Sequence, residues 1–156
     1  MNSIGIIGFG RFGKILSNIL QKGFIIKVYD IQFLSHHNGV QFTIIEEVLK
    51  EKEIFIAVPI RHFKSLINNI SGELKNNTTI IDVCSVKKYT SDVMKNILPE
   101  KIGIISSHPM FGPDSYLSNK KLKMMMHSTR DVLNQYDFCK KFFSDQNIKI
   151  LEMSPD

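Results

Sequence analysis

The sequence predicts an α/β protein with a doubly wound, mostly parallel sheet that carries helices on both faces. Three observations support this fold class. Apolar runs typical of buried strands alternate with amphipathic helical segments along the chain, the first run ends in a glycine-rich turn, and ionisable residues follow several of the strands. Such alternation is typical of parallel sheets, because each helix returns the chain to start the next strand in the same direction.

The chain opens with the clearest βαβ unit. An apolar strand over residues 3–8 leads into a Gly-x-Gly-x-x-Gly turn, and the helix predicted over 11–22 repeats apolar residues on one face. A second strand over 25–30 ends in Asp30. A glycine triplet alone is weak evidence, but between a strand and a helix it is typical of the dinucleotide-binding turn of a Rossmann-type sheet.

At each of the three glycine positions of the turn there is a physical reason for glycine. Gly8 permits the tight bend, Gly10 leaves room for a pyrophosphate against bare backbone, and Gly13 lets the helix pack closely on the strand. The helix N-terminus offers unpaired N–H groups to the phosphates. The alternative to a dinucleotide site is a βαβ unit whose glycine turn binds no ligand. The residues expected to bind the dinucleotide here are Gly8, Phe9, Gly10, Arg11, Phe12 and Gly13.

Asp30 predicts which dinucleotide is preferred. A carboxylate at the end of the second strand can accept hydrogen bonds from the adenosine ribose hydroxyls, whereas it would repel the 2′-phosphate of NADP. NAD is therefore favoured. NADP stays possible because nearby polar side chains could soften the repulsion, and these belong to Lys27, Gln32, His36 and His37.

The remaining segments continue the alternation. Further strands are predicted over 40–44, 53–58, 78–83, 102–106, 122–127 and 148–153. Further helices are predicted over 45–51, 61–71, 87–97 and 131–145. The methionines Met124, Met125 and Met126 are expected to fill the core on alternate sides of their strand. The sequence contains no repeat or interior linker, so we expect one domain over residues 1–156.

Several notable segments fall at predicted strand ends, where ligands bind in sheets of this kind. Besides the turn and Asp30, these are Ala57–Pro59, Asp82–Lys87 and Ser106–Ser115. His108 stands just beyond its strand and is a candidate general base, since imidazole titrates near neutral pH and can take a hydroxyl proton as hydride leaves the same carbon. Ser85 either caps the following helix or presents its hydroxyl to a substrate, and both interpretations stay open.

Composition excludes several other classes. With 43% hydrophobic and 22% charged residues, the chain resembles an ordinary globular protein. No apolar run approaches the length of a membrane span and the N-terminus enters a strand instead of a signal peptide, so we expect no membrane partner. The net charge of +5 is spread over many lysines, which favours attraction of small anions and disfavours nucleic-acid binding.

Cysteine and histidine usage argues against metal and disulfide chemistry. Cys84 and Cys139 are separated and form no C-x-x-C pair, which indicates neither a disulfide framework nor a zinc site. The adjacent His36 and His37 have no obvious carboxylate or thiol partner, and neighbouring residues rarely point at one ion. We therefore expect no metal and a cytoplasmic location.

Four segments together resemble the prephenate/arogenate dehydrogenase family of tyrosine biosynthesis. They are Gly8–Gly13, Asp82–Lys87, Ser107–Ser115 and Leu151–Pro155, in order over nearly the whole chain. The Ser-Val-Lys and His-Pro-Met-Phe-Gly-Pro motifs are far more specific than the glycine turn. The resemblance implies NAD(P)-dependent oxidative decarboxylation of prephenate or arogenate, in which hydride passes to nicotinamide, carbon dioxide leaves and the ring becomes aromatic.

The resemblance also implies residue roles. His108 would be the catalytic histidine, hydrogen-bonded to the substrate hydroxyl, and Ser85 would help to orient that hydroxyl and the histidine. Asp114 would lie near the active-site entrance. Val58 and Pro59 would line the nicotinamide side.

Two features depart from the family. Plant-like members that use NADP have non-acidic residues where this chain has Asp30. The family similarity and the carboxylate therefore favour different cofactors, and we expect NAD because of the carboxylate. Family members also continue into a helical domain that provides dimerisation and a substrate-binding arginine, whereas this chain stops at Asp156. Because charge-assisted pairs are strong, we expect the chain alone to bind dinucleotide, to turn over slowly or not at all, and to be a monomer or weak dimer.

Two alternatives remain open. A different dehydrogenase of this fold, such as a β-hydroxyacid dehydrogenase, usually places a catalytic lysine in its second domain, and the motif around His108 argues against it. A non-catalytic dinucleotide-binding module is favoured only by the missing helical domain.

Overall fold

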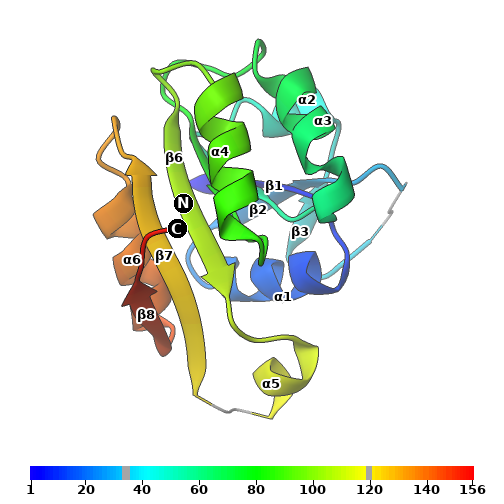
Figure 1. Ribbon diagram of the computed structural model, residues 1–156. Coiled ribbons are helices and arrows are strands. Elements are labelled where there is room, and N and C mark those ends of the chain that lie inside the picture. The colour runs from blue at the N-terminus through cyan, green and yellow to red at the C-terminus, as the bar shows by residue number, and fades with distance from the viewer. Residues whose placement is uncertain (33–35, 119–120) are drawn as a thin grey trace.

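A single sheet crosses the described part of the chain, residues 1–156 without 33–35 and 119–120, in this computed structural model (Figure 1). Its strands are β1 (Ser3–Ile7), β2 (Ile25–Tyr29), β3 (Val40–Phe42), β4 (Glu53–Ile56), β5 (Thr79–Asp82), β6 (Gly103–Pro109), β7 (Leu122–Arg130) and β8 (Ile148–Glu152). The helices are α1 (Arg11–Leu20), α2 (Ile45–Val48), α3 (Ile60–Ile70), α4 (Lys87–Ile97), α5 (Pro113–Leu117) and α6 (Tyr136–Asp145).

The strand order confirms the predicted doubly wound sheet. The strands follow the order β3-β2-β1-β4-β5-β6-β7-β8, and all neighbours are parallel except β6 and β7. The order reverses at β1, where Gly5 pairs with Lys27 on one side and with Ile54 on the other. Helices after β1 and β4 pass to opposite faces, so a crevice opens at the carboxyl end of β1.

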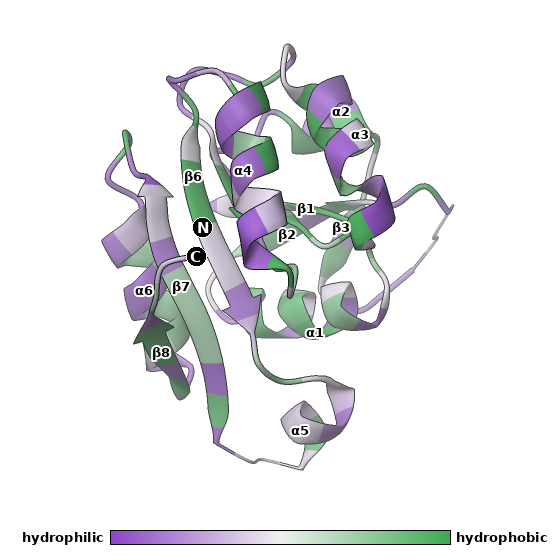
Figure 2. Ribbon diagram, viewed as in Figure 1, coloured by the Kyte–Doolittle hydropathy of each residue, from purple (hydrophilic) through white to green (hydrophobic). Residues whose placement is uncertain are grey.

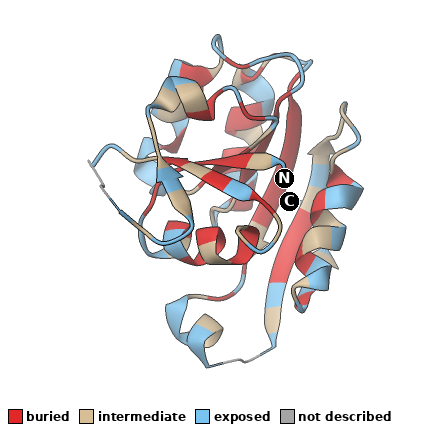
Figure 3. Ribbon diagram, turned by 180° about the vertical axis from the view of Figure 1, so that it is seen from behind, coloured by how far each residue is buried: buried red, intermediate tan, exposed pale blue. Residues whose placement is uncertain are grey.

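Alternate residues of the central strands pack into two separate cores. On β1, Ile6 joins the core under α1 and α6, whereas Ile7 joins the core under α2, α3 and α4. The longer helices α1, α3, α4 and α6 turn an apolar side inward and a hydrophilic side outward (Figure 2), and the central strands are buried between the two helical layers (Figure 3). Burial on both faces explains why these strands form continuous apolar runs in the sequence.

Strand β6 is longer than the predicted 102–106, and this moves His108. The predicted position of His108 beyond the strand is wrong, because β6 continues to Pro109 and His108 pairs with Met125 of the antiparallel β7. Pairing with β7 extends β6 beyond residue 106, and no local pattern in the β6 sequence indicates this pairing. On β7, Met124 and Met126 enter the core under α6, as expected from strand alternation.

Two predicted helix boundaries also differ, and one helix was not predicted. The last helix begins at Tyr136 instead of 131, because the Asp131 carboxylate accepts the N–H groups of Gln135 at 2.7 Å and Tyr136 at 3.2 Å and holds the preceding residues in a turn. Helix α2 ends at Val48 instead of 51, since the N–H groups of Lys50 and Glu51 bond three residues back and tighten the chain. Helix α5 was not predicted, although Pro113 suits a first helical position.

Candidate nucleotide cleft and catalytic histidine

Two positions of the glycine turn after β1 accept only glycine. Gly8 adopts φ +101°, which disfavours side chains, and a Cβ there would collide with the carbonyl oxygen of Ala57. A Cβ on Gly13 would lie 2.5 Å from the carbonyl oxygen of Gly8, so α1 packs directly on the turn. A Cβ on Gly10 would meet no protein atom within 4 Å, which leaves this backbone open to a bound group.

The turn forms one wall of a cleft of about 780 Å³, and the start of α3 forms another. A cleft of this size accommodates a small-molecule cofactor. Most residues predicted for the cofactor lie on it together: Gly8, Phe9, Gly10, Arg11, Phe12, Asp30, Val58 and Pro59. Gly13 does not line the cleft, because it is buried where α1 meets the turn.

The residues of this cleft fit a dinucleotide. Gly10 is the N-cap of α1, with no side-chain cap and no acidic residue in the first helical turn. The first N–H groups of α1 are therefore available to an anion, and the helix dipole favours negative charge there. The open space above Gly10 would admit a pyrophosphate against the backbone.

Asp30 is held at the edge of the cleft by two backbone donors. Its Oδ2 accepts the N–H of Phe9 at 2.7 Å, and its Oδ1 accepts the N–H of Gln32 at 2.8 Å. The carboxylate thus ties the end of β2 to the glycine turn. Because each carboxylate oxygen can accept a second hydrogen bond, ribose hydroxyls could still bind to it.

Lys27 does not soften the charge of Asp30, contrary to the expectation from their proximity in sequence. Its Nζ lies 2.7 Å from Glu51 Oε1, and Ser3 Oγ donates to the other oxygen of Glu51 at 2.5 Å. The ammonium group of Lys27 is therefore paired with Glu51. Of the two histidines, His37 packs edge-on against Phe9 with ring centroids 5.0 Å apart, whereas His36 is exposed.

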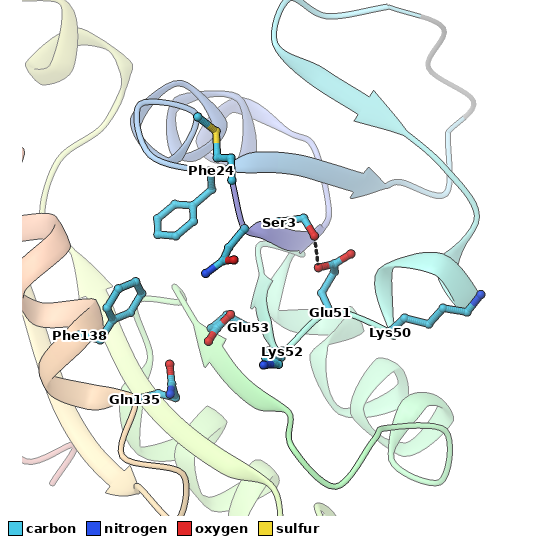
Figure 4. Close-up of a pocket in the computed structure, with 10 residues that line it drawn as sticks. Ser3, Phe24, Lys50, Glu51, Lys52, Glu53, Gln135 and Phe138 are labelled. Carbon is cyan, nitrogen blue, oxygen red and sulfur yellow. Dashed lines mark hydrogen bonds between the residues drawn. The ribbon is translucent and has the colours of Figure 1, made fainter.

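Glu51 also lines a second cavity, of about 600 Å³, at the amino ends of the strands (Figure 4). Phe24 and Phe138 form its apolar side, and Glu53 lines it as well. This cavity has mixed charges and no glycine turn, and it lies at the opposite edge of the sheet from His108. The cleft beside Gly10 is therefore the better candidate for a dinucleotide.

A buried ion pair lies behind His108. Lys87 at the start of α4 binds Asp82 at the end of β5, with their side chains 6% and 0% exposed. Ser107 connects the pair to β6, since its hydroxyl donates to the Asp82 carbonyl at 2.6 Å and its N–H donates to the Asp82 carboxylate at 3.4 Å. His108 follows directly on the same strand, so the pair and the imidazole share one edge of the sheet.

The surroundings keep His108 neutral. Burial and the positive charge of Lys87 lower its pKa from the ordinary 6.5, and together they outweigh the opposite effect of Asp82. An imidazole with a lowered pKa is uncharged at pH 7 and can accept a proton. The geometry therefore allows His108 to act as a general base.

Ser85 and Asp114 both lie exposed near the carboxyl edge of the sheet. The capping alternative for Ser85 is not supported, because Val86 is the N-cap of α4 and no side chain caps this helix. No hydrogen bond joins Ser85 to His108 in the described part of the chain, so their predicted cooperation is not seen directly. Asp114 occupies the first turn of α5, the segment that follows β6.

For several residues of the site the sequence predicted no role. Asp82, Lys87 and Ser107 lie in segments that were expected at this edge, but their cluster behind His108 was not foreseen. The signal that could have found it is an ionisable residue within an apolar strand, because buried charges are usually paired. The α3 wall of the cleft has no distinguishing signal in the sequence. Its polar members are Arg61, His62, Ser65 and Asn69.

Neither a metal site nor a membrane-spanning helix is found in the described residues. In the ranges described, no three His, Cys, Asp or Glu side chains are grouped so that they could hold a metal ion. The described helices are all too short or too polar to cross a membrane.

The sheet with its switch point, the glycine turn and the acid that ends β2 define a nucleotide-binding α/β domain, with an ionisable cluster beside the nucleotide cleft. A family model described as the nucleotide-binding domain of prephenate dehydrogenase matches residues 19–127. The chain belongs to this family, as its sequence motifs suggested. The family is not that of the β-hydroxyacid dehydrogenases, which were one alternative.

Two curated relatives come from Arabidopsis thaliana. Chloroplastic arogenate dehydrogenase 1 is 30% identical over 124 residues, which cover 74% of this chain and 19% of the relative. Chloroplastic arogenate dehydrogenase 2 is 27% identical over an alignment 165 positions long, and this alignment takes in 97% of this chain and 46% of the relative. This chain thus spans less than half the length of either relative.

Solved structures share the fold. Prephenate dehydrogenase from Aquifex aeolicus superimposes with a TM-score of 0.78 at 22% identity, over 99% of this chain and 62% of that chain. The same enzyme has been solved with hydroxyphenyl propionate and NAD+, and that structure matches with a TM-score of 0.76 at 19% identity, over 99% of this chain and 60% of that chain. At these identities the likeness establishes the Rossmann-type fold.

Proposed function

We propose that this chain is the nucleotide-binding and catalytic-histidine part of a dehydrogenase that oxidatively decarboxylates prephenate or arogenate. The observation that carries the proposal is the position of neutral, half-buried His108 at the carboxyl edge of the sheet, the same edge at which the glycine turn forms the cleft. The names of the curated relatives support this substrate class.

His108 would accept the proton of the ring hydroxyl as that carbon is oxidised. When bound, the nicotinamide would accept the hydride from the same carbon. Loss of the ring carboxylate as carbon dioxide would make the ring aromatic. The exposed Ser85 hydroxyl would help to orient the substrate hydroxyl, and Asp114 would lie at the entrance.

The three arginines of this chain leave the substrate carboxylates without a guanidinium partner near His108. Arg11 and Arg61 line the nucleotide cleft, and Arg130 donates to the carbonyls of Leu98, Pro99 and Ile102. Lys87 is a nearby cation, but it is bound to Asp82. We therefore propose that the chain alone turns over slowly.

Gly10→Ala tests the nucleotide site without disturbing the fold. Alanine has room there, since a Cβ would meet nothing within 4 Å and the backbone has φ −74°. We expect an unchanged melting temperature but NADH affinity weakened by about tenfold or more, because the methyl group would occupy the space of the pyrophosphate. A fluorescence titration with NADH measures this. An NADH affinity that does not fall in the folded variant would contradict a pyrophosphate at Gly10. The control is Gly72→Ala, since a Cβ at Gly72 also has open space around it and this residue lies outside the cleft.

We propose that Asp30 makes NAD the preferred cofactor, and Asp30→Ser tests this. Serine would remove the negative charge that faces the ribose and both bonds to the N–H groups of Phe9 and Gln32. We expect the ratio of NADH to NADPH affinity to fall by about tenfold, with some loss of NADH affinity because the turn is less well held. Parallel titrations with both cofactors measure the ratio. If selectivity for NADH does not fall, Asp30 has no role in cofactor choice.

A further inference from the structure

The charges of the nucleotide cleft are not those of a site that excludes phosphate. Its lining residues include two arginines, Arg11 and Arg61, and a single acidic residue, Asp30. Both oxygens of Asp30 already accept a backbone N–H, at 2.7 and 2.8 Å. These donors offset part of its negative charge, so the repulsion it exerts on a second anion is reduced.

Arg61 is placed to meet an anion in this cleft. It is the second residue of α3, so the positive end of the helix dipole adds to its own charge. Its Nε donates to His62 Nε2 at 3.1 Å, which orients the guanidinium. The terminal nitrogens have no hydrogen bond to any described residue, and both side chains are exposed along the cleft.

The wall that continues from Arg61 suits the adenosine half of a dinucleotide. Ser65 and Asn69 follow at successive helical turns and line the same cleft, opposite the end of β2 with Asp30 and Gln32. The ribose would lie at this end, because Asp30 is the residue that faces its hydroxyls. A group attached to the 2′-oxygen would therefore lie between the end of β2 and α3.

We propose that Arg61 is a second determinant of cofactor choice, which binds the 2′-phosphate of NADP and lets the chain use NADP as well as NAD. The planar guanidinium matches a phosphate with two parallel donors, which an ammonium group cannot do. This inference rests on the proposed nucleotide site. Asp30 favours NAD, and Arg61 limits that preference.

The test is a set of fluorescence titrations of the whole chain with NADH and with NADPH. In Arg61→Ala we expect NADPH affinity to weaken by about tenfold or more and NADH affinity by less than about twofold. Arg61→Lys should keep only part of the NADPH affinity, since it retains the charge without the planar fork. Lys64→Ala is the matched control, because Lys64 is an exposed cation of α3 that does not line the cleft.

Each other outcome is informative. Equal weakening of both cofactors in Arg61→Ala would place Arg61 on a part they share and overturn the inference, as would unchanged affinity for both. A wild-type chain that binds NADH but not NADPH would overturn the inference and leave the nucleotide site intact. Binding of neither would overturn the nucleotide site itself.

Discussion

Replacement of His108 by asparagine is expected to lower the rate of prephenate or arogenate oxidation by about two to four orders of magnitude and to leave NADH affinity unchanged. Asparagine keeps a hydrogen-bonding group of similar shape but cannot accept a proton. His108 lies on β6, outside the lining of the nucleotide cleft, so cofactor binding should not depend on it. The rate of NAD(P)H formation with each substrate measures the loss.

The assay requires a protein that turns over. Because we expect the chain alone to be slow, the comparison is made in the chain and in the chain supplied with the helical domain that the family resemblance implies. His127→Asn is the matched control, since His127 lies on the neighbouring β7 and pairs with Ser106. A variant at His108 that keeps its rate would contradict the catalytic assignment and favour a non-catalytic nucleotide-binding module.

The pH dependence of the rate gives the same assignment a second test. The pKa of His108 is lowered from 6.5, mainly by burial and then by Lys87. The imidazole therefore stays in its basic form at pH 6.5 and loses it only as the pH falls through the lowered pKa. We expect the acidic limb of the rate profile below pH 6.5, and a limb well above 6.5 would exclude His108 as the base.

Replacement of Lys87 by methionine is expected to destabilise the fold by about 3 to 5 kcal/mol, because it leaves the Asp82 carboxylate buried without its cation. Both side chains are almost completely buried. Burial raises the pKa of Asp82 and lowers that of Lys87, so each charge depends on the other. Denaturant unfolding monitored by circular dichroism measures the change in the free energy of unfolding.

The pH dependence and a double variant separate this cause from simple loss of packing. In Lys87→Met the pKa of Asp82 in the folded state should lie above its unfolded value. The loss of folding stability should therefore be absent at pH values below the pKa that Asp82 has in the unfolded chain. It should grow as the pH rises through the pKa that Asp82 has in the folded variant. Adding Asp82→Asn should recover much of the loss. Lys88→Met, next along the helix and 67% exposed, should change little.

A destabilisation at Lys87 that does not vary with pH, and that Asp82→Asn does not relieve, would show that packing and not charge holds this part of the fold. The expected result has a functional consequence as well. Loss of the Lys87 charge should raise the pKa of His108, which can be followed by NMR titration of the imidazole.

The limits of sequence-based prediction follow from particular elements. The first βαβ unit was predicted because its apolar strand, glycine turn and amphipathic helix are local patterns. The end of β6 was not, since pairing of His108 with Met125 depends on a strand that comes later in the chain. The start of α6 depended on the Asp131 carboxylate, which competes with the helix for the backbone N–H groups of Gln135 and Tyr136.

The sequence alone determined the fold class, the nucleotide-binding turn and the family, because these depend on periodicity and on motifs of contiguous residues. Only the tertiary structure decided how the site is held. Asp30 binds the N–H of Phe9 across 21 positions of the chain, and Ser107 binds Asp82 across 25. Packing of the sheet brings these groups together. Burial then lowers the pKa of His108, and no local sequence pattern specifies how deeply a side chain is buried.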